Sequence, residues 1–455
     1  MSVEEAKWHF GVLSFAGTGH LNPLMSLSLE LVLRGHRVTF FDKPKAEARV
    51  REAGFEFVPV GEKNDSGKEK MRFNARSMWS EISAMRSNLA HIQHDVERFL
   101  EEAPAAVSRA GVNALLIDEI ALAGPTVAQL LRLPYFIIST SVPHRFGWRC
   151  SSWFLGYRYS KSWLSWIQSV FLELSVTRMR GPLCSMLDEF RRRPGLGSVR
   201  TISKDFPCLA HIGQMPKCLD RPRRPVPKDF HYTGPFEWRT ARPHVAFPWH
   251  RLDGRPILYI SLGTTRNVQT ELLHMIAEAC EVFDLQLVIS LGNRFAPDSL
   301  ADLPGRPVVT KFAPQLEILK AAHIVVTHGG SNTVFEALAE GKPMIVIPLA
   351  YDQPAMAALL ARLHLAEVLP VMRLSARRIR RAVEKILRDR SYYDAAQRIQ
   401  IMMRSSRGEA LAADLIEKTL NQQIVSREAV IRTNQGGSSL ENDLEISRSV
   451  LGGVR

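Results

Sequence analysis

Residues 9–41 read HFGVLSFAGTGHLNPLMSLSLELVLRGHRVTFF, and this stretch decides the fold. An apolar run at its start is followed by a glycine-containing loop. Asn22 and Pro23 then form an N-cap and a proline suited to the first turn of a helix. The helix is expected to end at Gly35, and residues 36–41, His-Arg-Val-Thr-Phe-Phe, resume as a strand. Strand, helix and strand in this order predict a βαβ unit, and therefore a parallel sheet.

The rest of the chain repeats this pattern in two series. The first series continues with candidate strands at 114–118 and 134–139, and a proline-rich stretch at 222–256 separates it from the second. The candidate strands of the second series are residues 257–261, 285–290, 308–310, 324–327 and 344–347. Helical patterns lie between them. The sequence therefore predicts an α/β protein with two doubly wound, Rossmann-like domains that face each other across a cleft.

The expected boundaries follow from the strands and the changes in composition. They are residues 1–235 for the N-terminal domain, 236–256 for a proline-rich linker, 257–422 for the C-terminal domain and 423–455 for a polar, disordered tail.

Composition excludes several classes of protein. The 455 residues are 45% hydrophobic and 23% charged, which argues against wholesale disorder. The five cysteines show no C-x-x-C or histidine-paired spacing, so neither a zinc site nor a disulfide framework is indicated. The polar start and the lack of a long uncharged apolar run predict neither a signal peptide nor a transmembrane helix. We therefore expect a cytoplasmic protein with reduced thiols.

The net charge of +13 is concentrated in local clusters. One cluster is Arg191–Arg193 with Arg221, Arg223 and Arg224, and the other is Arg373, Arg377, Arg378, Arg380 and Arg381. The second cluster lies on a predicted helix that Ser375 opens, whose buried face would hold Ile379, Val383, Ile386 and Leu387. A solvated helix face explains it better than a contact with an anionic membrane. No nucleic-acid-binding motif accompanies the charge, so we expect no nucleic-acid partner.

Residues 327–333, Thr-His-Gly-Gly-Ser-Asn-Thr, lie between a predicted buried strand and a predicted helix at 334–340. Glycines let a ligand approach the backbone, and Ser331, Asn332 and Thr333 offer polar groups at the positive end of the helix. This pattern favours a phosphate site, although a tight turn with a helix cap would use the same residues. The lysine of a P-loop is absent, which argues against ATP hydrolysis.

His20 is a candidate general base. It follows Gly17-Thr18-Gly19, which with Asp42 forms only a weak dinucleotide fingerprint because Asn22 occupies the third glycine position. The dipole of the following helix is expected to keep the imidazole neutral at physiological pH, and Asp118 could accept its other ring N–H. Alternatively, each residue only stabilises its loop.

Taken together, these residues resemble the UDP-glycosyltransferase family of the GT-B fold (glycosyltransferase family 1). The segment from Phe312-Ala313-Pro314-Gln315 through residues 328–333 and Glu336 to Asp352-Gln353 is similar to that family's nucleotide-sugar signature. Residues 261–264, Asn22-Pro23 and Asp118 fall at the family's other functional loops, so the resemblance extends to about residue 420. Residues 9–61, 231–236 and 351–354 look most like the bacterial carotenoid (zeaxanthin) glucosyltransferase branch.

The resemblance implies the roles of the donor-binding residues. Phe312 would stack on uracil, Glu336 would accept the ribose hydroxyls, and Asp352 and Gln353 would bind the sugar. The residues implied for the diphosphate are Thr264, His328, Asn332 and Thr333, and Gln315, Gly330 and Ser331 complete the donor-binding set. The chain departs from the family where Phe312 replaces the common Trp and where Gly329 and Ser331 replace Cys and Trp. No D-x-D string occurs, and neither a metal nor a cofactor is expected.

The mechanism implied is inverting. His20, oriented by Asp118, would deprotonate an acceptor hydroxyl that attacks the anomeric carbon opposite UDP.

Residues 146–171 contain half of the eight tryptophans among basic residues, which suits a lipophilic acceptor or a membrane interface and equally a core helix hairpin. These residues are Trp148, Trp153, Trp163 and Trp166, with Arg145, Arg149, Arg158 and Lys161.

The sequence therefore predicts transfer of a hexose, with glucose the first candidate, from a UDP-sugar to a lipophilic alcohol such as a hydroxylated carotenoid or another terpenoid. A polyketide, macrolide or sterol-like acceptor is an alternative. A UDP-sugar epimerase, a lipid-linked-sugar transferase and a nucleotide-binding protein without turnover also remain open. The partners expected are the donor, the acceptor and, as an open alternative, the membrane surface.

Overall fold

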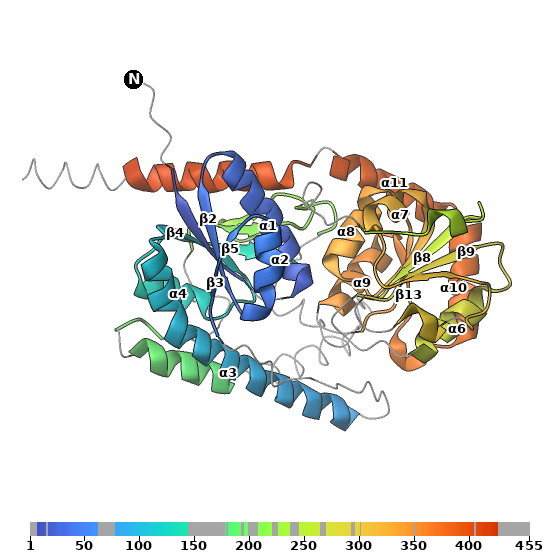
Figure 1. The fold of residues 1–455 in the computed structure, drawn as a ribbon, viewed down its shortest axis with the longest axis horizontal. Coiled ribbons are helices and arrows are strands. Elements are labelled where there is room, and N and C mark those ends of the chain that lie inside the picture. Colours follow the sequence, from blue (N-terminus) through green and yellow to red (C-terminus); the bar gives the residue numbers. More distant parts are fainter. Residues whose placement is uncertain are drawn as a thin grey trace, which may run out of the picture.

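The computed structural model contains two α/β domains that lie side by side (Figure 1). The residues that the structure describes are 7–14, 17–61, 78–143, 178, 181–192, 195–198, 208–220, 226–236, 245–263, 270–292, 296–300, 302–349, 352–404 and 406–425. The predicted tryptophan-rich segment at 146–171 lies outside them, as does Thr264.

The first domain is built on a seven-stranded sheet of order β3-β2-β1-β4-β5-β6-β7. Every neighbouring pair of strands is parallel. The strands are β1 His9–Leu13, β2 Arg37–Asp42, β3 Glu56–Pro59, β4 Ala114–Asp118, β5 Tyr135–Ser139, β6 His211–Gly213 and β7 Phe230–Tyr232. Its helices include α1 Thr18–Leu33, α2 Glu47–Glu52, α3 Met78–Ala110 and α4 Gly124–Leu130, with a 3-10 turn at Pro44–Ala46.

The second domain holds a six-stranded parallel sheet of order β10-β9-β8-β11-β12-β13. Its strands are β8 Ile257–Ser261, β9 Gln286–Ser290, β10 Val308–Thr310, β11 Ala322–Thr327, β12 Met344–Val346 and β13 Ala366–Val368. Its helices are α6 Thr270–Cys280, α7 Gln315–Ala321, α8 Ser331–Ala339, α9 Gln353–Arg362, α10 Ala376–Arg388 and α11 Ser391–Arg404, with 3-10 turns at Trp249–Arg251, Pro297–Leu300 and Val371–Arg373. The predicted pair of doubly wound parallel sheets is confirmed.

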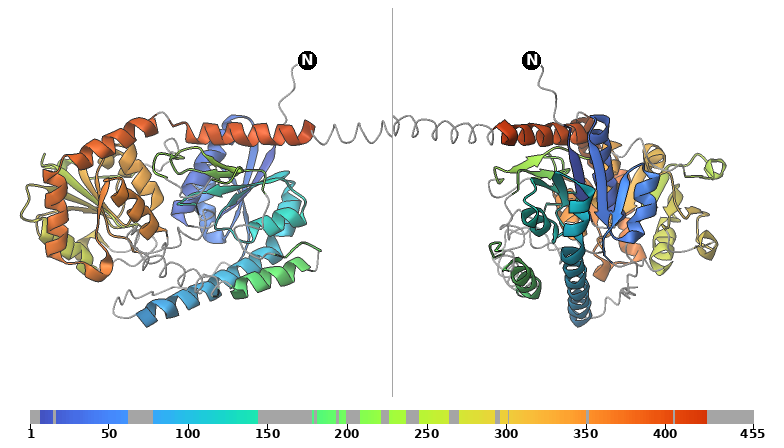
Figure 2. Two further views of the ribbon diagram at one scale, coloured as in Figure 1. Left: turned by 180° about the vertical axis from the view of Figure 1, so that it is seen from behind. Right: turned by 60° about the vertical axis from the view of Figure 1, so that its left-hand side comes forward.

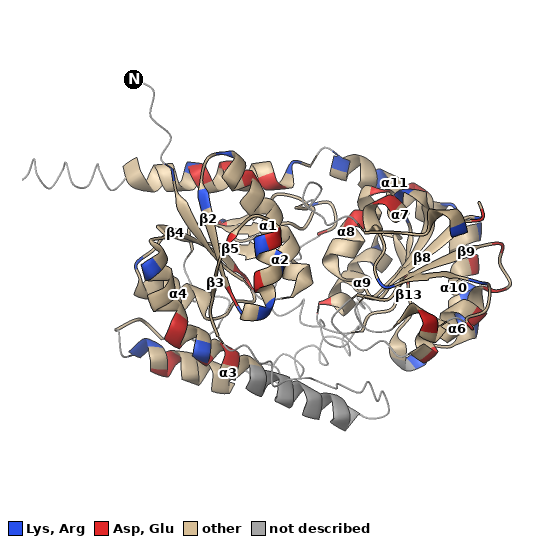
Figure 3. Cartoon of the chain, viewed as in Figure 1, with Lys and Arg blue, Asp and Glu red and all other residues tan. Residues whose placement is uncertain are grey.

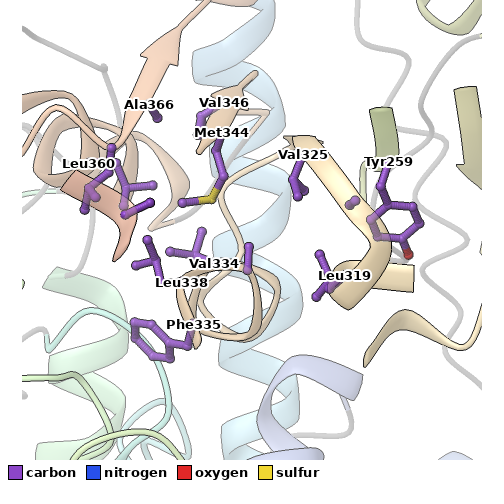
Figure 4. Packing of buried hydrophobic residues seen from close by; sticks show 14 of the residues in the cluster. Tyr259, Leu319, Val325, Val334, Phe335, Leu338, Met344, Val346, Leu360 and Ala366 are labelled. Carbon is purple, nitrogen blue, oxygen red and sulfur yellow. The ribbon is translucent and has the colours of Figure 1, made fainter. Parts of the chain in front are cut away.

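Most strand residues are apolar and buried, because helices cover both faces of each sheet. In the second domain, Val325 and Met344 of the sheet pack against Val334 and Leu338 of α8 (Figure 4). A separate cluster covers the other face, where Ile260 and Val326 meet Ile276 of α6. This two-sided burial is why the strands appear in the sequence as continuous apolar runs.

The last described helix, residues 408–425, crosses back from the second domain to the first (Figure 2). Its residues Ala412, Ala413, Ile416 and Leu420 are buried in the core formed by α1 and the first sheet. At its edge, Arg34 donates to Asp414 and Glu417, each at 2.7 Å. The sequence assigned these residues to the second domain, whereas their apolar face packs on the first. Residues 423–425, predicted as tail, continue this helix.

Helix α1 begins four residues before the predicted N-cap. It starts at Thr18 with Gly17 as N-cap, so Pro23 lies inside the helix and His20 lies in its first turn. The expectation that a loop runs to residue 21 and that Asn22 caps the helix was therefore wrong. Asn22 instead accepts a hydrogen bond from the Arg49 guanidinium at 2.5 Å.

Helix α10 has the expected amphipathic character, with one correction. Ser375 caps it by accepting a hydrogen bond from Arg378 N, and Ile379, Val383 and Ile386 are fully buried. Leu387 is 40% exposed, because it lies about 80° around the helix from Ile379. Arg377, Arg378, Arg380 and Arg381 are exposed on this helix, as its predicted amphipathic pattern requires (Figure 3).

The other basic cluster is only partly described. Arg191 is 3% exposed and donates to Thr126, Gln129 and the Gly197 carbonyl, so this arginine is a buried structural residue. Arg193, Arg221, Arg223 and Arg224 lie outside the described residues. Within the described part of the chain, no helix is both long and apolar enough to cross a membrane.

Candidate active site

His20 contacts two residues at the carboxyl edge of the first sheet. Its Nδ1 lies 2.9 Å from Asp118 Oδ2, at the end of β4, and 2.7 Å from Thr140 Oγ1, directly after β5. A carboxylate only accepts hydrogen bonds, so Nδ1 carries the hydrogen and the neutral ring has its unprotonated nitrogen at Nε2. Asp118 is held in turn by a hydrogen bond from Ile120 N at 3.1 Å. The predicted pairing of His20 with Asp118 is therefore present, with Nε2 as the proton-accepting atom.

The electrostatics of His20 differ from the sequence expectation. Burial lowers the pKa of His20, but the charge and hydrogen bond of Asp118 raise it, and the charges of Asp352 and Asp42 act in the same direction. The net result is a pKa above the ordinary value for histidine. The helix dipole was expected to keep the ring neutral. The three nearby carboxyl groups act in the opposite direction, because they favour the protonated ring.

Asp42 is a second buried acid at this edge. It is 2% exposed at the end of β2 and accepts hydrogen bonds from Ser14 Oγ at 2.5 Å and from Lys43 N at 2.6 Å. Burial raises the pKa of this carboxyl to about 6, and the nearby Asp118 contributes to the rise. Asp42 therefore changes charge close to neutral pH.

A buried polar cluster that the sequence did not reveal supports the same edge. Ser139 Oγ lies 2.5 Å from Glu119 Oε2 and 2.5 Å from His211 Nε2, and both Ser139 and His211 are fully buried. The cluster fixes the ends of β4, β5 and β6 relative to one another. Single polar residues in short strands give no sequence signal of this kind.

In the second domain, two glycines enclose the His328 ring. A Cβ added at Gly263 would lie 2.6 Å from His328 Nε2, and one added at Gly330 would lie 2.5 Å from it. Both distances are shorter than a real contact, so only glycine fits at either side. The ring is thereby placed beside the N-terminus of α8, whose first N–H groups have no helical acceptor. The histidine and the helix N-terminus therefore lie together at residues 327–333, where the sequence predicts a phosphate site.

The residues implied for the nucleoside are Phe312 and Glu336. Phe312 is 42% exposed, as a stacking platform must be. Gln315 Nε2 donates to Glu336 Oε2 at 2.6 Å, and the hydroxyl of the buried Tyr259 donates to Gln315 Oε1 at 3.0 Å. Tyr259 therefore fixes Gln315, and Gln315 orients Glu336. Tyr259 was not predicted, because within an apolar strand it looks like an ordinary core residue.

The two residues implied for the sugar begin α9. Asp352 accepts a hydrogen bond from Ser331 Oγ at 3.3 Å, which links α9 to the start of α8. Gln353 Oε1 accepts from Leu349 N at 2.8 Å, so this oxygen holds the preceding loop. The sequence assigned Gln353 to a sugar hydroxyl, and its oxygen already has a structural partner. Ser331 and Thr333 are both buried in the first turn of α8.

The two halves of the site meet through Asn332. Its Nδ2 donates to the Gly19 carbonyl of α1 at 3.0 Å, and its Oδ1 accepts from Gln214 Nε2 at 3.3 Å. The first turn of α8 is therefore in direct contact with the turn of α1 that carries His20. Among the residues that the structure describes, no group of three or more His, Cys, Asp or Glu side chains has the arrangement of a metal site.

Comparison with known proteins gives consistent results along the chain. Residues 204–407 match the family model "UDP-glucoronosyl and UDP-glucosyl transferase", and residues 12–137 match the "Glycosyltransferase family 28 N-terminal domain". The chain is 27% identical to the zeaxanthin glucosyltransferase of Pseudescherichia vulneris, with 90% of this chain and 98% of that protein covered. It is 28% identical to the 4'-demethylrebeccamycin synthase of Lentzea aerocolonigenes, over 89% and 98%.

A solved structure shows the same fold. The crystal structure of the glycosyltransferase of kitacinnamycin aligns with a TM-score of 0.71 at 24% identity, and the alignment covers 91% of this chain and 99% of that one. The two-domain architecture is thus shared along almost the full length.

Replacing Asp118 with Asn is expected to lower the pKa of His20, because the largest raising influence is lost while burial stays. NMR titration of the His20 ring measures this directly. With the pKa raised in the folded state, the pair stabilises the protein fully below about pH 6.5, and this stabilisation is lost as pH rises through the folded pKa. Asp253→Asn, which removes an exposed carboxylate in the other domain, should leave the titration unchanged. An unchanged His20 titration in Asp118→Asn would contradict the assignment.

Proposed function

This chain is a glycosyltransferase of the GT-B type, and we propose that it transfers glucose or another hexose from a UDP-sugar to a hydroxyl of a lipophilic acceptor, with inversion at the anomeric carbon. The observation that carries the proposal is the contact between the two halves of the site. His20, oriented by Asp118, lies in the helical turn that Asn332 of the donor helix touches. A base and an anion site joined in this way suit attack on one side of a sugar and departure of a diphosphate on the other.

The proposed mechanism needs no covalent intermediate. His20 Nε2 accepts the proton of the acceptor hydroxyl while its oxygen attacks the anomeric carbon, and the bond from that carbon to the diphosphate oxygen breaks. Asp118 stabilises the imidazolium that forms. The N–H groups at the start of α8, together with His328, take up the charge of the departing diphosphate. A donor with an α-linked sugar then gives a β-glycoside.

Glu336 supports a ribonucleotide donor. A carboxylate fixed by Gln315 can accept hydrogen bonds from a ribose diol, and the exposed Phe312 ring offers a face for a base. Uracil is the proposed base because the matched family model is that of UDP-sugar transferases.

The acceptor is the least constrained part of the proposal. A hydroxylated carotenoid or another terpenoid is favoured by the similarity to a zeaxanthin glucosyltransferase. An antibiotic-type aglycone is the second candidate, since the identity to 4'-demethylrebeccamycin synthase is of the same size. We propose that a membrane-resident acceptor is met from the cytoplasm at the bilayer surface, through the basic and tryptophan-rich residues 145–166.

Product analysis tests the function as a whole. We expect mass spectrometry to show hexosyl products when UDP-glucose is supplied with anionic vesicles that contain zeaxanthin. Matched reactions contain a macrolide aglycone or no acceptor. Transfer to the aglycone alone would favour the second candidate, and conversion of UDP-glucose without any acceptor would favour an epimerase. Equal activity on a small water-soluble phenol, with no vesicle binding, would remove the support for a lipid acceptor.

His20→Ala is expected to reduce turnover at least about a hundredfold, because a positioned base contributes a factor of this size. Affinity for UDP should change little, since the implied nucleotide pocket lies in the other domain. Turnover is measured at saturating UDP-sugar and UDP affinity by calorimetry. His323→Ala, which removes an exposed histidine at the opposite end of β11, is the control. More than about a tenth of wild-type turnover in His20→Ala would exclude His20 as the base.

Glu336→Ala is expected to weaken UDP binding by about 1.5–3 kcal/mol, the value of hydrogen bonds to a charged partner. The loss should be much smaller for 2'-deoxy-UDP, which has one ribose hydroxyl fewer. Glu340→Ala, one turn later at the end of α8, serves as the control. Equal losses for the two nucleotides would argue against a contact between Glu336 and the 2'-hydroxyl.

Transfer is expected to survive EDTA, because the start of α8 and His328 are proposed to take up the diphosphate charge without a metal ion. The rate is compared before and after chelation. Loss of activity that Mg²⁺ or Mn²⁺ restores would overturn this part of the proposal.

A further inference from the structure

Pro23 leaves a carbonyl of α1 without its usual partner. In an α-helix each N–H donates to the carbonyl four residues earlier, and the partner of the Gly19 carbonyl would be the N–H of residue 23. Proline has no N–H. The Gly19 carbonyl therefore points out of the first turn of α1, one residue before His20, as an acceptor that a donor from elsewhere can use.

The donor comes from the other domain. Asn332 Nδ2 lies 3.0 Å from the Gly19 oxygen, and the other end of the same amide accepts from Gln214. A side-chain amide has one acceptor and one donor end, so this pairing fixes which end faces which partner. Both partners belong to the first domain, and Asn332 is the second residue of α8. We call the Gly19 carbonyl, Gln214 and Asn332 the clasp.

Gln214 is rigidly held. It is 1% exposed and follows β6 directly. Its Nε2 donates to the Thr140 carbonyl as well as to Asn332, and its Oε1 accepts from Phe236 N at 3.3 Å. Its own N–H donates to the Ser139 carbonyl at 3.2 Å. A buried amide with this many partners has one orientation, because any other would leave buried polar groups unpaired.

The Gln214 amide also contacts a residue that is hydrogen-bonded to His20. Gln214 holds the carbonyl of Thr140, and the hydroxyl of Thr140 lies 2.7 Å from His20 Nδ1. The clasp thus contacts the turn of His20 twice: through Gly19, its neighbour in the chain, and through Thr140, its hydrogen-bonding partner. The second domain reaches both contacts through the single side chain of Asn332.

We propose that Gln214 is a positioning residue. It couples the position of α8 to the orientation of the His20 ring. The inference rests on the proposed function for its reaction and on the clasp for its geometry. A base must face the acceptor in line with the leaving group, and a misplacement of about 1 Å can cost about a hundredfold in rate. The clasp supplies this register, since it joins the two domains at the residues next to the base and next to the anion site.

Gln214→Met tests the proposal, because it keeps the size of the side chain and removes both ends of the amide. Gln286→Met is the matched control. Gln286 is 2% exposed, its amide also bonds to two main-chain groups, Arg251 O and Asp253 N, and it begins β9, at the sheet edge opposite the site. Both variants should lose similar thermal stability. Only Gln214→Met should lose turnover, by about tenfold at saturating substrates, with UDP affinity unchanged.

A double-mutant cycle separates positioning from general destabilisation. If Gln214 couples α8 to His20 through Asn332, the loss of turnover in the double variant Gln214→Met with Asn332→Leu should be smaller than the two single losses combined, because both changes break the same hydrogen bond. Hydrogen exchange provides a readout without catalysis: the amides of residues 17–25 should exchange faster in Gln214→Met and not in Gln286→Met.

The outcomes are distinct. Additive losses in the cycle, or turnover and exchange in Gln214→Met equal to those in Gln286→Met, would overturn the positioning role. A wild-type protein that transfers no sugar would overturn the proposed function alone, because the exchange comparison still decides whether the clasp holds the His20 turn.

Discussion

Both sheets are parallel throughout, and the placement of every functional side chain depends on this constraint. In a parallel sheet all strands end at one edge, so the connections that follow them gather there. His20, Asp118 and Thr140 follow three strands of the first sheet, and His328 and Asp352 follow two strands of the second. Helices also begin at this edge, so the positive end of α8 faces the site without any cationic side chain. The sheet topology thus determines where the functional side chains lie, and the local sequence determines which side chains they are.

The site is divided between two domains, which creates a second requirement: the base and the proposed anion site must stay at a fixed distance from each other. Two features of unlike chemistry meet it. The helix at 408–425 binds the domains through apolar burial, with Ala412 and Ile416 in the core of the first domain. The clasp binds them through directional hydrogen bonds at the site itself. Burial supplies most of the free energy but little orientation, whereas hydrogen bonds supply orientation, so the combination gives both affinity and register.

The sequence predicted the fold and most of its strands. Strands at 114–118, 257–261 and 308–310 have the predicted bounds, because buried strands are uninterrupted apolar runs. Strands β3, β6, β7 and β13 were missed, because each contains a polar residue within only three or four residues and so forms no apolar run. The start of α1 was misplaced because the rule for proline is local, whereas the donor to Gly19 comes from the other domain. Gln214 and Tyr259 were missed for the same reason, because their roles depend on contacts with residues that are distant in the sequence.

The charge around His20 is the least local property of the site. Three carboxyl groups raise its pKa: Asp42 and Asp118 at strand ends of the first domain, and Asp352 at the start of α9 in the second. Asp118 touches the ring, whereas Asp42 and Asp352 act through space, and the influence of Asp352 depends on how the second domain is seated. A higher pKa strengthens His20 as a proton acceptor but increases the protonated fraction that cannot act as a base. Because burial raises the pKa of Asp42 to about 6, its charge falls as pH drops through this value. The electrostatic support that Asp42 gives to protonated His20 therefore weakens as pH drops through this value.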